Sequence, residues 1–78
     1  MSAQRRLAAI FQAWTLLVDK DTLHELIIEW LTEYKHLIKN QDLVTEILTR
    51  VDTTEVVNDF MCGDRYRVIR SQFLTEKQ

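Results

Sequence analysis

The sequence predicts an all-α protein, a small bundle of four to five helices in a single domain that spans residues 1–78. The chain has no proline and only one glycine, Gly63, so almost nothing in it interrupts a helix. Leu, Ile, Glu, Lys and Ala recur at helical spacing. A chain of 78 residues has room for one core and buries only about 60–65% of the surface that its unfolded form exposes. Chains this short usually gain stability from disulfides, metals or association.

The first predicted helix runs from about Ala3 to Val18 and contains the most apolar stretch of the chain. Between residues 7 and 18 only Gln12 and Thr15 are polar. Because a helix that is apolar on most sides does not lie on a surface, we expect it to be central to the fold or buried against a second copy of the chain. One helical stripe holds the largest of its apolar residues, namely Leu7, Ile10, Phe11, Trp14, Leu17 and Val18.

The second predicted helix extends from Thr22 to about Lys39 and has the strongest helical periodicity. Asp19 or Asp21 offers an acceptor for its first amides, so the connection from the first helix is tight. Such a short connection makes the two helices antiparallel neighbours, and the bundle is predicted to be built on this N-terminal hairpin. The apolar face of the second helix consists of Leu23, Leu26, Ile27, Trp30, Leu31, Tyr34, Leu37 and Ile38.

Two shorter helices are predicted next. Asn40 is expected to cap a helix from Gln41 to about Val51. Asp52, with Glu55 three residues later, has the spacing of a capping box that opens a fourth helix. The residues expected to face the core are Leu43, Val44, Ile47, Leu48 and Val51 in the third helix and Val56, Val57, Phe60 and Met61 in the fourth.

A last helix is predicted from Arg65 to about Thr75. Gly63 is expected to end the fourth helix in a left-handed conformation, and Asp64 to cap the last one. Tyr66, with Ile69 and Phe73, forms its apolar side. The alternative is a fourth helix that continues through Gly63 as one bent rod.

Association is the expected source of extra stability. A single cysteine, Cys62, excludes an internal disulfide and fits a reducing, cytoplasmic location. Arg5 and Arg6 before an apolar run resemble a secretory or mitochondrial targeting segment, but no small-x-small cleavage site follows Val18, so we expect a retained helix. The run is too short to span a membrane. We therefore predict a homodimer, with its interface formed by Leu7, Ile10, Phe11, Trp14, Leu17 and Trp30.

Charge is distributed unevenly along the chain. The formal net charge is −2, but residues 19–59 hold ten acids against four bases, while both ends are basic. The basic ends can pair with the acidic middle either within one chain or across a dimer, where the charges would set the register of an antiparallel or interdigitated homodimer. On the second helix Glu25, Glu29 and Glu33 recur every four residues, which stacks like charges on one face and favours a basic partner.

Contact with another protein is the function that these features favour. The residues expected to bind a partner are Glu25, Ile28, Glu29 and Glu33. Ile28 and Leu74 lie off the main apolar stripes, so we expect them to be exposed contact residues. The sequence therefore predicts a non-enzymatic protein–protein interaction module, which means a small adaptor, regulator or inhibitor acting as a helical homodimer.

A dimeric nucleic-acid-binding regulator is the alternative. Basic residues gather at the two chain ends, which a dimer can combine into one phosphate-binding surface. Their number is small, however, and the helix after Asp52 carries Glu55 and Asp59, which repel DNA. The candidate nucleic-acid-binding residues are Arg5, Arg6, Arg65, Arg67 and Arg70.

No catalytic or metal-binding motif is recognisable. Glu33 and His36 have Glu-x-x-His spacing, but the first helix supplies no acid to complete a di-metal site. His24 and Glu25 begin an HExxH motif in which Ile28 replaces the second histidine. Cys62 has no base beside it and is expected to be a small buried apolar residue, and His24 a surface residue. We expect no enzyme activity, cofactor, metal or small-molecule substrate.

Overall fold

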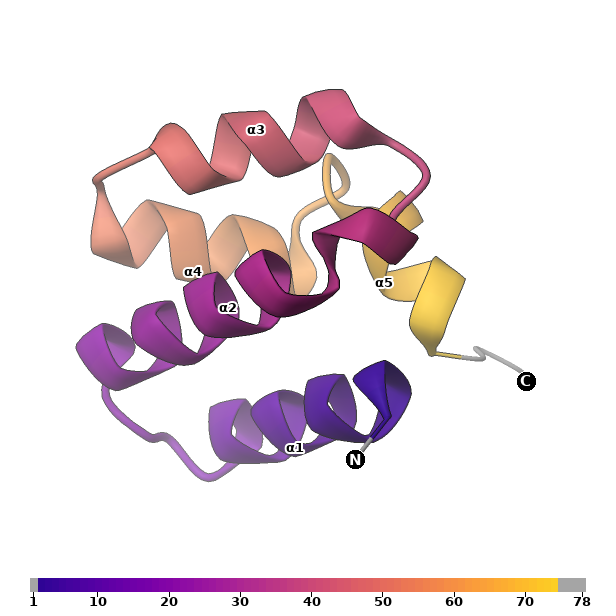
Figure 1. Ribbon diagram of the computed structural model, residues 1–78. Helices are drawn as coiled ribbons and strands as arrows, with labels where there is room; N and C mark the ends of the chain where they lie inside the picture. Colours follow the sequence, from indigo (N-terminus) through magenta and orange to yellow (C-terminus); the bar gives the residue numbers. More distant parts are fainter. Residues whose placement is uncertain (1, 75–78) are drawn as a thin grey trace.

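Five α-helices and one 3-10 turn make up residues 2–74, the part of the chain that this computed structural model describes (Figure 1). The elements are α1 (Ala3–Thr15), α2 (Lys20–Tyr34), η1 (Lys35–Leu37), α3 (Gln41–Thr49), α4 (Thr53–Cys62) and α5 (Arg67–Phe73). The principal extents are nearly equal, at 26, 26 and 25 Å. The prediction of a small all-α bundle is confirmed.

The central element is α2. It packs against α1, α3 and α4, and Figure 1 shows it running between α1 and α4. Four of its side chains are buried, at helical spacing: Leu23, Ile27, Trp30 and Leu31. The inward-facing residues predicted for α4 are confirmed, since Val56, Val57, Phe60 and Met61 are all buried. The helix with the strongest periodicity, and not the most apolar one, therefore organises the core.

Trp30 is the largest buried side chain and joins three parts of the bundle. Its ring centroid lies 5.0 Å from that of Phe73 in an edge-on arrangement and 6.3 Å from that of Phe60. Its Nε1 donates a hydrogen bond of 2.9 Å to the backbone carbonyl of Ala3. This bond satisfies the one polar atom of the ring and holds the start of α1 against α2.

Three predicted helix caps are confirmed. Asp19, rather than Asp21, caps α2, because its Oδ2 accepts a hydrogen bond from the backbone N–H of Thr22 at 3.1 Å. Asn40 caps α3 and Asp52 caps α4, each by accepting from the N–H three residues later. These bonds satisfy amides that have no partner within the helix.

The second helix is shorter than predicted. It ends at Tyr34, and beyond the 3-10 turn the backbone of Ile38 is extended. The extended backbone places the Ile38 side chain in the core, where it is 3% exposed. The Gln41 side chain caps the end of this turn, because its Nε2 donates hydrogen bonds to the carbonyls of Lys35 and Ile38 at 2.7 and 2.6 Å. Continuation of the helix to Lys39 was a wrong prediction, because the chain leaves the helix after Tyr34 and the nearby Gln41 side chain satisfies the carbonyls that this frees.

The prediction for Gly63 is wrong in its conformation. The helix ends at Cys62, so α4 does not continue as a bent rod, and the φ angle of Gly63 is −78°, which is not left-handed. A glycine is required for a different reason. A Cβ atom there would lie 2.8 Å from the carbonyl oxygen of Asp59, which is closer than such atoms approach.

The last helix begins later than predicted. Its N-cap position is Tyr66, without a side-chain capping bond, so Asp64 is not the cap. The helix ends at Phe73, and the predicted end at Thr75 lies outside the described residues. α3 likewise ends at Thr49, and Val51, which was predicted to face the core, is 90% exposed.

Half of the predicted dimer interface lies in the protomer's own core. Leu7 and Trp30 are 0% exposed and Ile10 is 5% exposed, because α2 and α5 both pack against α1. These three residues are therefore not on the surface that a second copy would meet. Phe11 and Trp14 are half-buried, and Leu17 is 88% exposed.

Candidate protein-binding surface

The end of α1 has the hydrogen bonds of a Schellman motif. The N–H of Val18 donates to the carbonyl of Ala13 at 3.2 Å, and the N–H of Leu17 donates to that of Trp14 at 3.1 Å. The motif requires a left-handed residue at the position of Leu17, where glycine is the usual choice. Leu17 has a φ angle of 63°, the one positive φ of a non-glycine residue among residues 2–74.

Leu17 therefore occupies an unfavourable conformation and an unfavourable environment. A left-handed backbone costs a residue with a side chain about 1–2 kcal/mol. Its side chain is 88% exposed, and that of the preceding Leu16 is 71% exposed. Backbone strain of this kind clusters at functional sites, so Leu17 marks the end of α1 as a candidate site.

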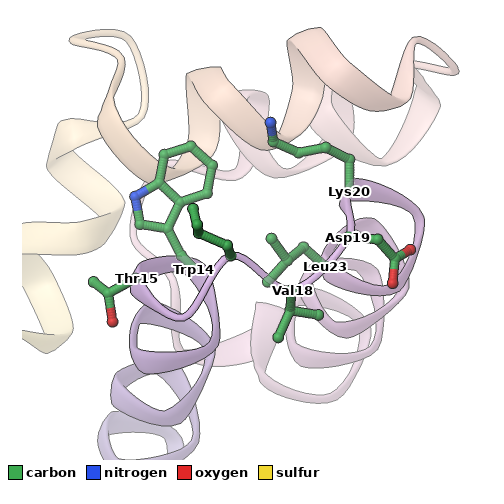
Figure 2. A pocket seen from close by; sticks show the side chains of 7 residues that line it. Trp14, Thr15, Val18, Asp19, Lys20 and Leu23 are labelled. Atoms are coloured by element: carbon green, nitrogen blue, oxygen red, sulfur yellow. The ribbon is translucent and has the colours of Figure 1, made fainter.

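A hollow of about 460 Å³ lies beside these leucines, where α1 turns into α2. Figure 2 shows Trp14, at the end of α1, and Lys20, at the start of α2, on either side of Val18 and Leu23. The Nζ atom of Lys20 lies 5.4 Å from the centre of the Trp14 ring. We call this surface the α1–α2 corner; it comprises the exposed Leu16 and the residues that line the hollow, namely Trp14, Thr15, Leu17, Val18, Asp19, Lys20 and Leu23.

The predicted partner-binding residues lie together on the outer side of α2. Glu25 and Glu29 are exposed, and Ile28 between them is half-buried. Ile28 lines two shallow hollows, of about 460 and 370 Å³, together with Glu29. Glu33 forms an ion pair with Arg6 of α1. We call Glu25, Ile28, Glu29 and Glu33 the α2 acidic face. Leu74 does not join it and is partly buried against the core.

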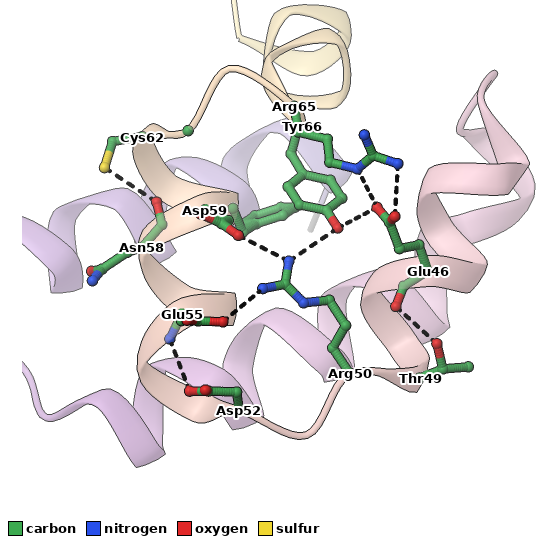
Figure 3. Close-up of polar contacts among 12 residues, drawn as sticks. Glu46, Thr49, Arg50, Asp52, Glu55, Asn58, Asp59, Cys62, Arg65 and Tyr66 are labelled. Carbon is green, nitrogen blue, oxygen red and sulfur yellow. Dashed lines mark hydrogen bonds and ion pairs between the residues drawn. The ribbon is translucent and has the colours of Figure 1, made fainter.

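A polar network joins α3 to α4 and to the segment before α5 (Figure 3). Arg65 binds both carboxylate oxygens of Glu46, with Nε and Nη2 at 2.6 and 2.7 Å. The hydroxyl of Tyr66 also donates to Glu46, at 2.6 Å. Arg50 donates to the Tyr66 hydroxyl at 3.3 Å and pairs with Asp59 at 2.9 Å. The network fixes the chain that leads into α5, so its role is structural.

Acid should lower the free energy of unfolding because it protonates Glu46. The hydrogen bonds from Arg65 and then Tyr66 lower the pKa of Glu46 from 4.5 to about 2. Because the folded pKa is depressed, this stabilisation is fully present above pH 4.5 and is lost as the pH falls towards 2. We expect the free energy of unfolding to depend less steeply on pH in Glu46→Gln than in the wild type across this range. The two slopes should differ by up to the equivalent of one bound proton. Urea titrations at several pH values measure them. Arg65→Gln should flatten the profile in the same range, and profiles parallel to the wild type would contradict the assignment.

The five arginines of the alternative function have different environments. Arg70 is only 8% exposed and donates from Nη1 to the carbonyls of Phe60 and Gly63 at 2.9 and 2.8 Å. This arginine faces the protein, contrary to its predicted place on a phosphate-binding surface. Two others, Arg6 and Arg65, are in ion pairs. Arg5 and Arg67 are exposed.

The residues considered for chemistry are dispersed. The Nδ1 atom of His24 lies 3.1 Å from the Thr53 hydroxyl, and its Nε2 is buried without a hydrogen-bond partner among residues 2–74. His24 is thus half-buried rather than on the surface. Cys62 is exposed, contrary to the prediction, and its Sγ donates to the carbonyl of Asn58. Across the described part of the chain, no three His, Cys, Asp or Glu side chains group as a metal site.

Comparisons with known proteins add no assignment. No protein-family model, curated protein or solved structure matches the chain. None of the helices within residues 2–74 combines the length and the apolar character needed to cross a membrane. The surfaces described above are therefore the basis for a functional proposal.

Proposed function

We propose that this protein is a non-enzymatic protein–protein interaction module, a small adaptor, regulator or inhibitor. The module is built on an antiparallel hairpin of α1 and α2 and acts as a homodimer in the cytoplasm. The observation that carries the proposal is the α1–α2 corner, where Leu16 and Leu17 are 71% and 88% exposed and Leu17 has a left-handed backbone. Adjacent leucines exposed beside a hollow are typical of a contact surface.

The α2 acidic face supports a second contact, made with another protein. Its half-buried Ile28 lies between Glu25 and Glu29, so an apolar centre is flanked by charges, as at protein interfaces. Arg6 of the chain's own α1 already pairs with Glu33 at one end of this face. A partner with basic side chains one helical turn apart can pair with the other two glutamates in the same way.

Charge reversal on the α2 acidic face should remove that partner. We expect the tagged wild type, purified under mild conditions from its native source, to bring down a defined protein. The double variant Glu25→Lys and Glu29→Lys should lose that protein, because like charges then face the basic partner. Thr45→Lys, which adds a lysine to the exposed side of α3, is the control and should retain it.

Two results would count against the module. One is recovery of the same protein in equal amount with the double variant, which would place the contact elsewhere. The other is repeated recovery of the chain without any other protein. All three positions are exposed, so we expect the substitutions to leave the helices intact. Circular dichroism of each variant checks this.

A further inference from the structure

We infer that the α1–α2 corner docks a second copy of this chain about a two-fold axis, with Leu17 of each copy seated in the hollow of the other. This inference rests on the proposed homodimeric function and names the surface through which the two copies meet. It replaces the stripe of Leu7 and Ile10, which the protomer encloses.

The shape of the corner is the first support. A two-fold interface uses the same patch on both copies, so the patch must be complementary to itself. The corner meets this condition because a projecting side chain and a hollow lie side by side. Leu17 is 88% exposed and borders a hollow of about 460 Å³. The apolar walls of the hollow are Trp14, Val18 and Leu23.

The charges of the corner are the second support. Its rim carries one acid and one base, Asp19 and Lys20, which are adjacent in the chain. A two-fold axis that sets Lys20 of one copy against Asp19 of the other makes the same contact again on the opposite side. The patch is therefore complementary in charge to itself. A strongly basic or strongly acidic partner would meet one favourable and one unfavourable charge instead.

The conformation of Leu17 is the third support. Glycine at this position would relieve the left-handed backbone without the loss of any contact inside the protomer, because the side chain is almost fully exposed. A leucine at this position is more favourable than a glycine only where something outside the protomer buries its side chain. The second copy supplies that burial in the arrangement inferred here.

Light scattering and sedimentation equilibrium at micromolar concentration test the inference with three proteins. The wild type is expected to have twice the mass of one chain. Leu17→Gly removes one leucine from each side of the interface and should raise the dissociation constant by about 100-fold or more. Val51→Ser is the matched control, because Val51 is 90% exposed but lies outside the corner, and this variant should remain dimeric.

Loss of the dimer in Leu17→Gly can be distinguished from a failure of this variant to fold. Leu17→Gly relieves backbone strain, so in its monomeric state it should unfold at a urea concentration at least as high as the wild-type monomer does. Loss of the dimer together with retained stability supports the inference. A wild type that is monomeric at these concentrations overturns it.

The outcomes also separate this inference from the proposed function. A wild-type dimer that Leu17→Gly leaves unchanged overturns docking at the corner, while the homodimeric module stands. Co-expression of tagged and untagged copies gives a second readout, since the untagged copy should be recovered with the tagged wild type and lost with tagged and untagged Leu17→Gly. Recovery from both pairs in equal amount overturns the inference, and the partner contact at Glu25 and Glu29 remains a separate experiment.

Discussion

Trp30→Ala should lower the free energy of unfolding by about 3–5 kcal/mol, the usual loss for a fully buried large aromatic residue. Trp30 is 0% exposed and contacts the rings of Phe60 and Phe73, so its removal leaves a cavity between α2, α4 and α5. The carbonyl of Ala3 also loses its hydrogen-bond donor. Small domains have a total stability of about 5–15 kcal/mol, so this variant should be close to unfolded at room temperature. Urea denaturation at fixed protein concentration measures the change.

Two variants serve as controls for the Trp30 prediction. Trp14→Ala makes the same substitution at the half-buried tryptophan of the corner, and we expect it to cost clearly less. Trp30→Phe keeps most of the aromatic packing but loses the Nε1 hydrogen bond to Ala3, so its cost should be about 1–2 kcal/mol. Equal losses for Trp30→Ala and Trp14→Ala would contradict the central position of Trp30 in the core.

Arg70→Met should lower the free energy of unfolding by about 3 kcal/mol, because it removes a charged donor from one buried and one partly buried carbonyl. The Nη1 atom of Arg70 bonds the carbonyls of Phe60, in the last turn of α4, and of Gly63, just after its end; neither carbonyl has a further helical turn to bond. Methionine has a similar apolar stem, so the variant isolates the loss of the guanidinium. Urea denaturation, followed by circular dichroism, provides the measurement.

Arg67→Met is the matched control for Arg70, because Arg67 lies one turn earlier on α5 and is exposed. We expect it to change stability by less than about 0.5 kcal/mol. Arg70→Lys keeps the charge without the planar fork and should recover only part of the loss. A loss for Arg70→Met as small as that for Arg67→Met would mean that water replaces the guanidinium at these carbonyls.

The apolar character of α1 led the sequence interpretation towards an interface that the protomer largely encloses. Leu7 and Ile10 are covered because α2 lies along one side of α1 and α5 contacts it as well. Periodicity identifies the stripe of a helix that must be buried, but it does not specify which neighbour buries it. The apolar surface that remains exposed lies at the end of α1, at Leu16 and Leu17, where the sequence predicted continuing helix.

The polar network was not predicted, and the reason is distance along the chain. Glu46 lies 19 and 20 residues from Arg65 and Tyr66, so no local pattern relates them. For Arg65 the sequence left two uses open, a phosphate-binding surface or pairing with the acidic middle of the chain, and the pair with Glu46 is of the second kind. The one available signal was the excess of acids in the middle of the chain and of bases at its ends, which indicates pairing but not the partners.

The sequence by itself determined the helical class, the caps at Asp19, Asn40 and Asp52, and the buried sides of α2 and α4. These features depend on residues within about four positions of one another, where helix geometry fixes which groups meet. Tertiary structure alone decided the burial of Ile38 from an extended backbone after the end of α2, the burial of Arg70 and the left-handed backbone of Leu17. Each depends on how the helices pack or on how the chain turns between them. The carbonyls at the end of α4, for example, accept hydrogen bonds from Arg70, a residue that packing brings near.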